Sequence, residues 1–76
     1  QGRFAEAKQR YRKALQVKPF FIEAHNNLGI ILAKEGEKAE AIHHFTTALR
    51  LRPNYQAAGN NLNFLLKEKG KIKKDP

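Results

Sequence analysis

Histidine is the residue type in this 76-residue sequence with the widest chemical range, as a metal ligand or a general base. His25, His43 and His44 are the three copies. Two ligands on one helix must share a face, for example at positions i and i+4. His43 and His44 are adjacent, so their side chains point about 100° apart on a helix, and His25 lies in another segment. We therefore expect structural histidines, with no metal and no cofactor.

The side chains that most often act as covalent nucleophiles are missing. The sequence contains no Cys and no Ser, and no glycine-rich loop follows a strand pattern to hold a phosphate. Glu37 and Glu40 resemble a pair of catalytic acids, but they stand in the first turn of an expected helix, where negative charge is favourable. We expect that the chain is not an enzyme.

Asparagine forms a polar pattern that recurs along the chain. Asn26-Asn27 is followed 34 residues later by Asn60-Asn61. The amide of Asn offers two hydrogen-bond donors and an acceptor, which match the main chain of an extended peptide. Because Asn is a mediocre helix former, its recurrence in adjacent pairs on helical segments favours a binding role.

The same 34-residue offset relates residues along most of the sequence and defines the elements that position these side chains. Gly2 aligns with Gly36 and Gly70, and Pro19 aligns with Pro53. Between these positions, apolar residues recur with helical periodicity in four segments, and no segment alternates with the period of a strand. The sequence predicts an all-α fold of about four helices.

The residues at the core positions resemble the signature of the tetratricopeptide repeat family. Leu28-Gly29 stands as its Leu-Gly pair, and Leu32 replaces the Tyr that follows in the signature. The signature residues of the second helix of a repeat are matched at two places in the sequence. The first set is Ala7, Tyr11, Ala14 and Pro19, and the second is Ala41, Phe45, Ala48 and Pro53. The resemblance implies a helix-turn-helix solenoid, a right-handed superhelix in which small residues let the helices approach closely.

The register of the signature divides the sequence into parts. We expect one repeat domain over residues 1–70, made of a second-helix half repeat (2–19), a full repeat (22–55) and a first-helix half repeat (56–70). Residues 71–76 form a basic tail that we expect to be frayed. Because a solenoid usually needs about three repeats, we also expect the sequence to be part of a longer protein.

In the tetratricopeptide family the first helix of each repeat lines a concave binding surface. The resemblance therefore implies a protein-interaction module that binds an extended peptide of a protein partner, and Asn27 and Asn61 would stack along the groove. This pattern is similar to the asparagine ladder in the repeat domains of O-GlcNAc transferases. The peptide-binding residues implied are Asn26, Asn27, Ile30, Asn60, Asn61 and Phe64, and the inner face continues to Lys34 and Glu68.

Two other functions stay open from the sequence. An uncovered last helix with Phe64, Leu65 and Leu66 close together could join copies into a homo-oligomer. The net charge of +8 is concentrated at the two ends of the sequence and could contact nucleic acid or an anionic membrane. We rank that contact last, because the basic tail has no interleaved aromatic residues. The lack of Cys and of a signal peptide is compatible with the cytoplasm.

Overall fold

A computed structural model describes the backbone of residues 2–74 and the side chains of residues 3–68. Residues 2–74 form four α-helices, α1 (Gly2–Val17), α2 (Ile22–Lys34), α3 (Lys38–Leu51) and α4 (Gln56–Lys74). Strands are absent from residues 2–74. The prediction of an all-α fold with four helices is therefore confirmed.

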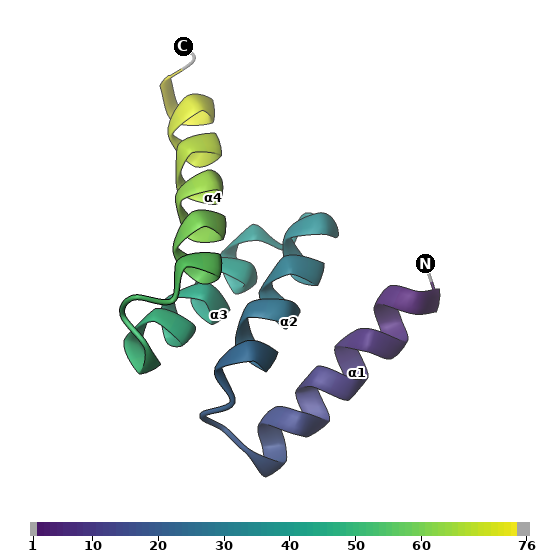
Figure 1. The fold of residues 1–76 in the computed structure, drawn as a ribbon. Helices are drawn as coiled ribbons and strands as arrows, with labels where there is room; N and C mark the ends of the chain where they lie inside the picture. Colours follow the sequence, from purple (N-terminus) through teal and green to yellow (C-terminus); the bar gives the residue numbers. More distant parts are fainter. Residues whose placement is uncertain (1, 75–76) are drawn as a thin grey trace.

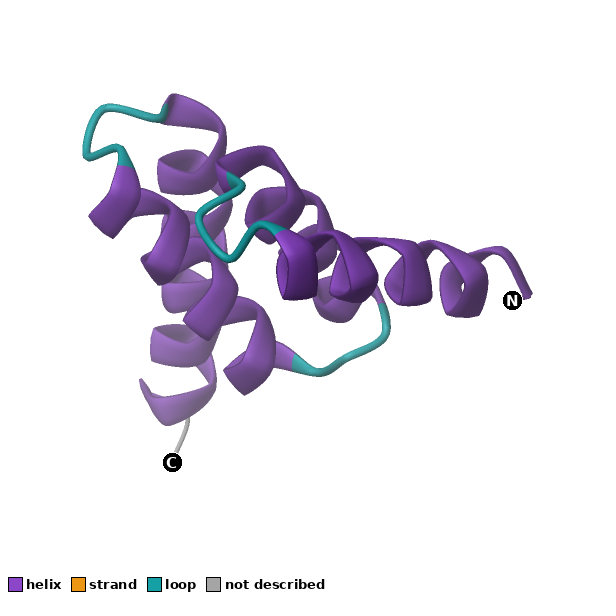
Figure 2. Cartoon of the chain, turned by 90° about the horizontal axis from the view of Figure 1, so that it is seen from below, coloured by secondary structure: helices purple, strands orange, loops and turns teal. Residues whose placement is uncertain are grey.

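Helix α2 is the centre of the arrangement. It packs against α1, α3 and α4, while α4 also packs against α3. Figure 1 shows α1 and α2 side by side, with α4 on the far side of α2 from α1. The short loops in Figure 2 reverse the chain between consecutive helices, as in other bundles with short connections.

Two proline turns, 34 residues apart, set the same reversal at the start of α2 and of α4. In residues 18–21 and again in residues 52–55, the N–H of the fourth residue donates to the carbonyl of the first over 3.1 Å. Pro19 and Pro53 occupy the second position of these turns, where the fixed φ of proline fits. The repeat in the sequence is thus a repeat in backbone geometry.

The turn between α2 and α3 depends on a glycine. Gly36 has φ of +84°, a conformation that side chains with a Cβ rarely adopt. The N–H of Gly36 donates to the carbonyl of Ala33 over 3.0 Å, and the N–H of Glu37 donates to that of Leu32 over 2.8 Å. These two bonds form a Schellman motif, which satisfies carbonyls that the end of α2 leaves without helical partners.

The core lies where α2, α3 and α4 meet, and its buried residues are Leu28, Leu32, Ala41, Phe45, Ala48, Ala58 and Leu65. Leu65 was expected on a surface for self-association, and that expectation is wrong, because its side chain is only 4% exposed. Leu65 belongs to the core that α4 forms with α2 and α3, whereas Phe64 and Leu66 on either side remain exposed.

The end of α4 also differs from the expectation. The sequence predicted that this helix ends near Gly70, but it continues to Lys74. A glycine inside a helix costs only about 1 kcal/mol relative to alanine, and the lysines around Gly70 are good helix formers. Residues 75 and 76 of the expected frayed tail lie outside the described residues.

Candidate functional site

A hollow of about 280 Å³ lies between the C-terminal half of α2 and the middle of α4. The residues that line it are Ile30, Ala33, Lys34, Phe45, Asn61, Phe64, Leu65 and Glu68. The structure thus brings together three of the six residues predicted to bind a peptide, Ile30, Asn61 and Phe64. We call this feature the α2–α4 hollow.

The α2–α4 hollow has an apolar interior. Phe45 and Leu65 are buried and form its base, Ile30 is half-buried, and the side chain of Phe64 is 62% exposed. The sequence analysis placed Phe45 among the structural residues and Leu65 on an outer surface. The helical period assigns a residue to a face, but it does not show that the hollow reaches down to the core.

Charged residues stand at the end of the hollow away from Asn61. The carboxylate of Glu68 lies 3.4 Å from Lys38 Nζ on α3. Lys34 is exposed at the same end, and no ion pair of Lys34 is present among the described side chains. The rim of the hollow therefore has one neutralised carboxylate and one cation open to solvent.

The four asparagines of the predicted ladder occupy different environments. Asn61 Nδ2 donates to Asn26 Oδ1 over 3.2 Å, which links α4 to α2. Asn26 is only 5% exposed, so it supports Asn61 from below and is not part of the open surface. Asn27 is half-buried and Asn60 is exposed, and neither lines the hollow. Asn61 keeps its carbonyl oxygen and one amide hydrogen for a ligand.

Two of the three histidines meet in the structure, which their spacing in the sequence did not predict. His25 Nε2 lies 2.8 Å from the carbonyl oxygen of Pro19 and must donate to it. In a neutral ring Nδ1 of His25 is then an acceptor, so Nδ1–H of His44 donates to it over 3.1 Å. The pair connects α3 to the start of α2 and to the proline turn before it.

The pKa of His44 is lowered from 6.5 to about 4. Burial is the main cause, and His25 and His43 lower it further. Glu40, whose Oε2 lies 3.9 Å from His44 Nε2, acts in the opposite direction, while Arg12 binds that carboxylate over 3.1 Å. Within the part of the chain that the structure describes, no group of three or more His, Cys, Asp or Glu residues is placed to hold a metal.

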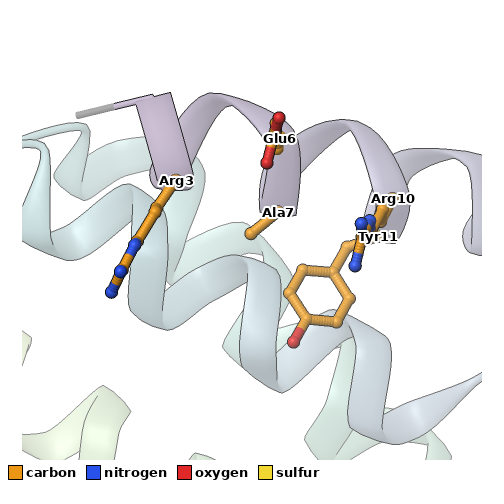
Figure 3. A pocket seen from close by; sticks show the side chains of 5 residues that line it. All are labelled: Arg3, Glu6, Ala7, Arg10 and Tyr11. Atoms are coloured by element: carbon orange, nitrogen blue, oxygen red, sulfur yellow. The ribbon is translucent and has the colours of Figure 1, made fainter.

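A second hollow, of about 450 Å³, lies along α1 (Figure 3). It is lined by Arg3, Glu6, Ala7, Arg10 and Tyr11, and Figure 3 shows Ala7 and Tyr11 on one side of the helix. The positions 34 residues later are Glu37, just before α3, and Glu40, Ala41, His44 and Phe45 on α3, and they include residues that α2 covers. This hollow is therefore the α1 counterpart of a helix-packing face.

None of the helices within residues 2–74 combines the length and the apolar character that crossing a membrane requires.

Comparison with known families gives two matches. The profile described as "Tetratricopeptide repeat" matches residues 22–55, which include α2, α3 and the turn to α4. A second profile, described as "TPR repeat", matches residues 1–36 and so covers α1 and α2. The first match has the same bounds as the full repeat expected from the sequence. No curated protein matches the chain.

Proposed function

Because the chain belongs to the tetratricopeptide repeat family, whose members are generally protein–protein interaction modules, we propose that it binds an extended segment of a partner protein in the α2–α4 hollow. The family is typically a non-catalytic scaffold. The proposal therefore concerns recognition of a protein segment by a preformed surface.

The observation that carries the proposal is the exposed side chain of Phe64 beside the amide of Asn61. Phe64 is 62% exposed and lines an apolar hollow, so a ligand in the hollow would bury its ring together with the apolar surface around it. An apolar hollow with a few polar groups at its rim is the usual form of a binding site. Phe64 and Asn61 come from the same helix, so the packing of α4 fixes both.

The hydrogen bond between Asn61 and Asn26 supports this role. Since one amide hydrogen of Asn61 is held by a buried acceptor, the side chain has one orientation, with its carbonyl oxygen directed away from Asn26. A fixed amide loses little entropy when it binds the main chain of a peptide. Asn27, half-buried at the equivalent position of α2, would offer a second amide to the same segment.

The proposal is tested by selecting peptides from a random-sequence display library and titrating a selected peptide into variants of the chain. We expect Phe64→Ala to weaken binding by about tenfold, the effect of losing an interface residue worth more than 1 kcal/mol. Asn27→Ala should weaken it by a smaller factor. Phe20→Ala is the matched control, because Phe20 is 76% exposed and lies outside the hollow.

Circular dichroism of each variant must show that the helices are retained. If Phe64→Ala binds as tightly as the original chain, the peptide does not occupy the hollow and the proposal fails. Failure to select any peptide would contradict it as well.

A further inference from the structure

We propose that the α2–α4 hollow selects segments in which an apolar side chain and an acidic side chain are two residues apart. The apolar side chain sits between Ile30 and Phe64, and the acidic one pairs with Lys34. This inference rests on the proposed function, which by itself requires only that an extended segment binds and says nothing of its side chains.

The apolar half of the motif follows from the size and lining of the hollow. A closed protein cavity of about 150 Å³ accommodates benzene. The α2–α4 hollow is larger, at about 280 Å³, and its base is formed by Phe45 and Leu65. One aromatic or branched aliphatic side chain fits there, and it would cover the exposed ring of Phe64 and bury its own apolar surface.

The acidic half of the motif follows from the charges around Lys34. The carboxylate of Glu68, across the hollow, is 3.4 Å from Lys38 Nζ. The carboxylate of Glu35, next to Lys34 in the sequence, is 2.8 Å from Lys8 Nζ. Both neighbouring acids are thus neutralised by other lysines, whereas Lys34 has no such partner among the described side chains. A carboxylate of the ligand would complement the positive charge of Lys34 at this end of the hollow.

The spacing follows from helix and strand geometry. Ile30 and Lys34 are one turn apart on α2, a rise of about 6 Å at 1.5 Å per residue. An extended peptide covers nearly the same distance in two residues, at about 3.3 Å each. Its side chains at positions i and i+2 lie on the same side of the strand, so both can face the hollow. Adjacent residues would point to opposite sides.

This geometry does not determine whether the apolar residue comes before or after the acidic residue in the bound segment. The test therefore uses peptides with both orders. The probes are blocked seven-residue glycine peptides that contain Phe-Gly-Glu or Glu-Gly-Phe. Comparison peptides replace Glu by Lys, replace Phe by Gly, or make Phe and Glu adjacent. Binding is followed by the chemical shifts of backbone amides of the isotope-labelled chain, which detect even weak complexes.

We expect at least one of the two orders to bind and to shift amides of Ile30, Lys34 and Phe64. Each of the three changes in the peptide should weaken binding by about fivefold or more, the effect of losing roughly 1 kcal/mol. In the chain, Lys34→Glu should reverse the preference, so that the Lys peptide binds better than the Glu peptide. Lys13→Glu, an equal charge change at an exposed position of α1, should leave the preference unchanged.

The outcomes separate this inference from the proposed function. If library-selected peptides bind in the hollow but lack the motif, or if the seven-residue probes bind with equal affinity, the motif is overturned and peptide binding stands. If Lys34→Glu and Lys13→Glu change the preference equally, only the net charge matters and the pairing with Lys34 is overturned. If neither probes nor selected peptides bind, both proposals fail.

Discussion

His44 couples the stability of the full repeat to pH at the scale of a single residue. In the folded chain its pKa is about 4, whereas an exposed histidine has a value of 6.5. The groups that face it are Arg12 from α1, His25 from α2, and His43 and Glu40 on α3. Its Nδ1–H is committed to His25, whose other nitrogen is committed to the carbonyl of Pro19. A proton on His44 would therefore add a half-buried charge beside two other rings.

The sign of the pH dependence follows from linkage. Because the folded pKa is depressed, the unfolded chain binds more protons between pH 6.5 and about 4. The contribution of His44 is complete above pH 6.5 and is lost as the pH falls toward 4. We expect a loss of about 1–2 kcal/mol in the free energy of unfolding, which is less than the full shift implies because solvent reaches part of the ring.

Urea unfolding above pH 6.5 and near pH 4 measures this loss in the original chain and in two variants. His44→Asn keeps an amide near the position of Nδ1 but cannot titrate, so its stability should fall less with acid. His43→Asn changes an exposed ring one residue away and should retain the acid loss. An equal dependence on pH in the original chain and in His44→Asn would contradict the assignment.

At the scale of the helices, Gly29 sets how closely α2 approaches α3. A Cβ added to Gly29 would lie 2.7 Å from Cε1 of Phe45, a distance that real Cβ atoms essentially never show. The ring of Phe45 is itself buried, so it has little freedom to move away. Gly59 stands in α4, and a Cβ there meets no atom within 4 Å. Replacement by alanine should therefore change the stability of the chain in opposite directions at Gly29 and at Gly59.

Gly29→Ala should destabilise the chain by about 1–3 kcal/mol, the usual cost of overpacking a core. Gly59→Ala should stabilise it by up to about 1 kcal/mol, because alanine is the better helix former and nothing obstructs it. Thermal unfolding of both variants under identical conditions checks the pair. Similar shifts of the melting temperature in the same direction would show that the close contact between Gly29 and Phe45 does not govern the packing of α2 and α3.

The helices could be predicted from the sequence because their boundaries depend on local chemistry. Proline at the second position of two equivalent turns and a glycine at positive φ are readable without a structure, and three of the four helices end near such residues. Gly70 was misleading, because nothing in the local sequence distinguishes a glycine that caps a helix from one that a helix tolerates. The expectation of an uncovered last helix placed Leu65 on a surface for self-association, whereas the packing of α4 buries it and leaves Phe64 and Leu66 exposed.

The candidate site was less predictable, because it depends on contacts between residues of three different helices. The resemblance to the repeat family implied that Ile30, Asn61 and Phe64 share the inner face, and the structure brings these three together. The repeat treated Asn26 and Asn60 as equivalent, whereas one is buried beneath Asn61 and the other is exposed. That difference arises from the packing of α2 between α1 and α4, which no single segment encodes.

At the scale of the whole molecule, association of copies depends on whether α4 of one chain can pack on α1 of another as α2 packs on α3. The face of α2 includes His25, Leu28, Gly29 and Leu32, and the equivalent positions of α4 are Gly59, Leu62, Asn63 and Leu66. Asn63 thus takes the place of Gly29, and Tyr11 of α1 takes the place of Phe45. Since even a Cβ is too close to the ring in the internal contact, the side chain of Asn63 obstructs this docking.

Repulsion between the positive charges of two copies also opposes this docking. The chain has a net charge of +8, and Arg3 and Arg10 line the hollow of α1 that would receive α4. We therefore expect a monomer by sedimentation equilibrium at about 0.1 M salt, and also at about 1 M salt, where exposed charges more than about 3 Å apart are largely screened. Asn63→Gly should associate, and more strongly at the higher salt, because the steric obstruction is removed and the repulsion is screened. Asn60→Gly, the same substitution at an exposed position of α4, is the control and should stay monomeric. If the original chain and Asn63→Gly associate equally, Asn63 does not block the contact, and the exposed faces of α1 and α4 form an interface between copies.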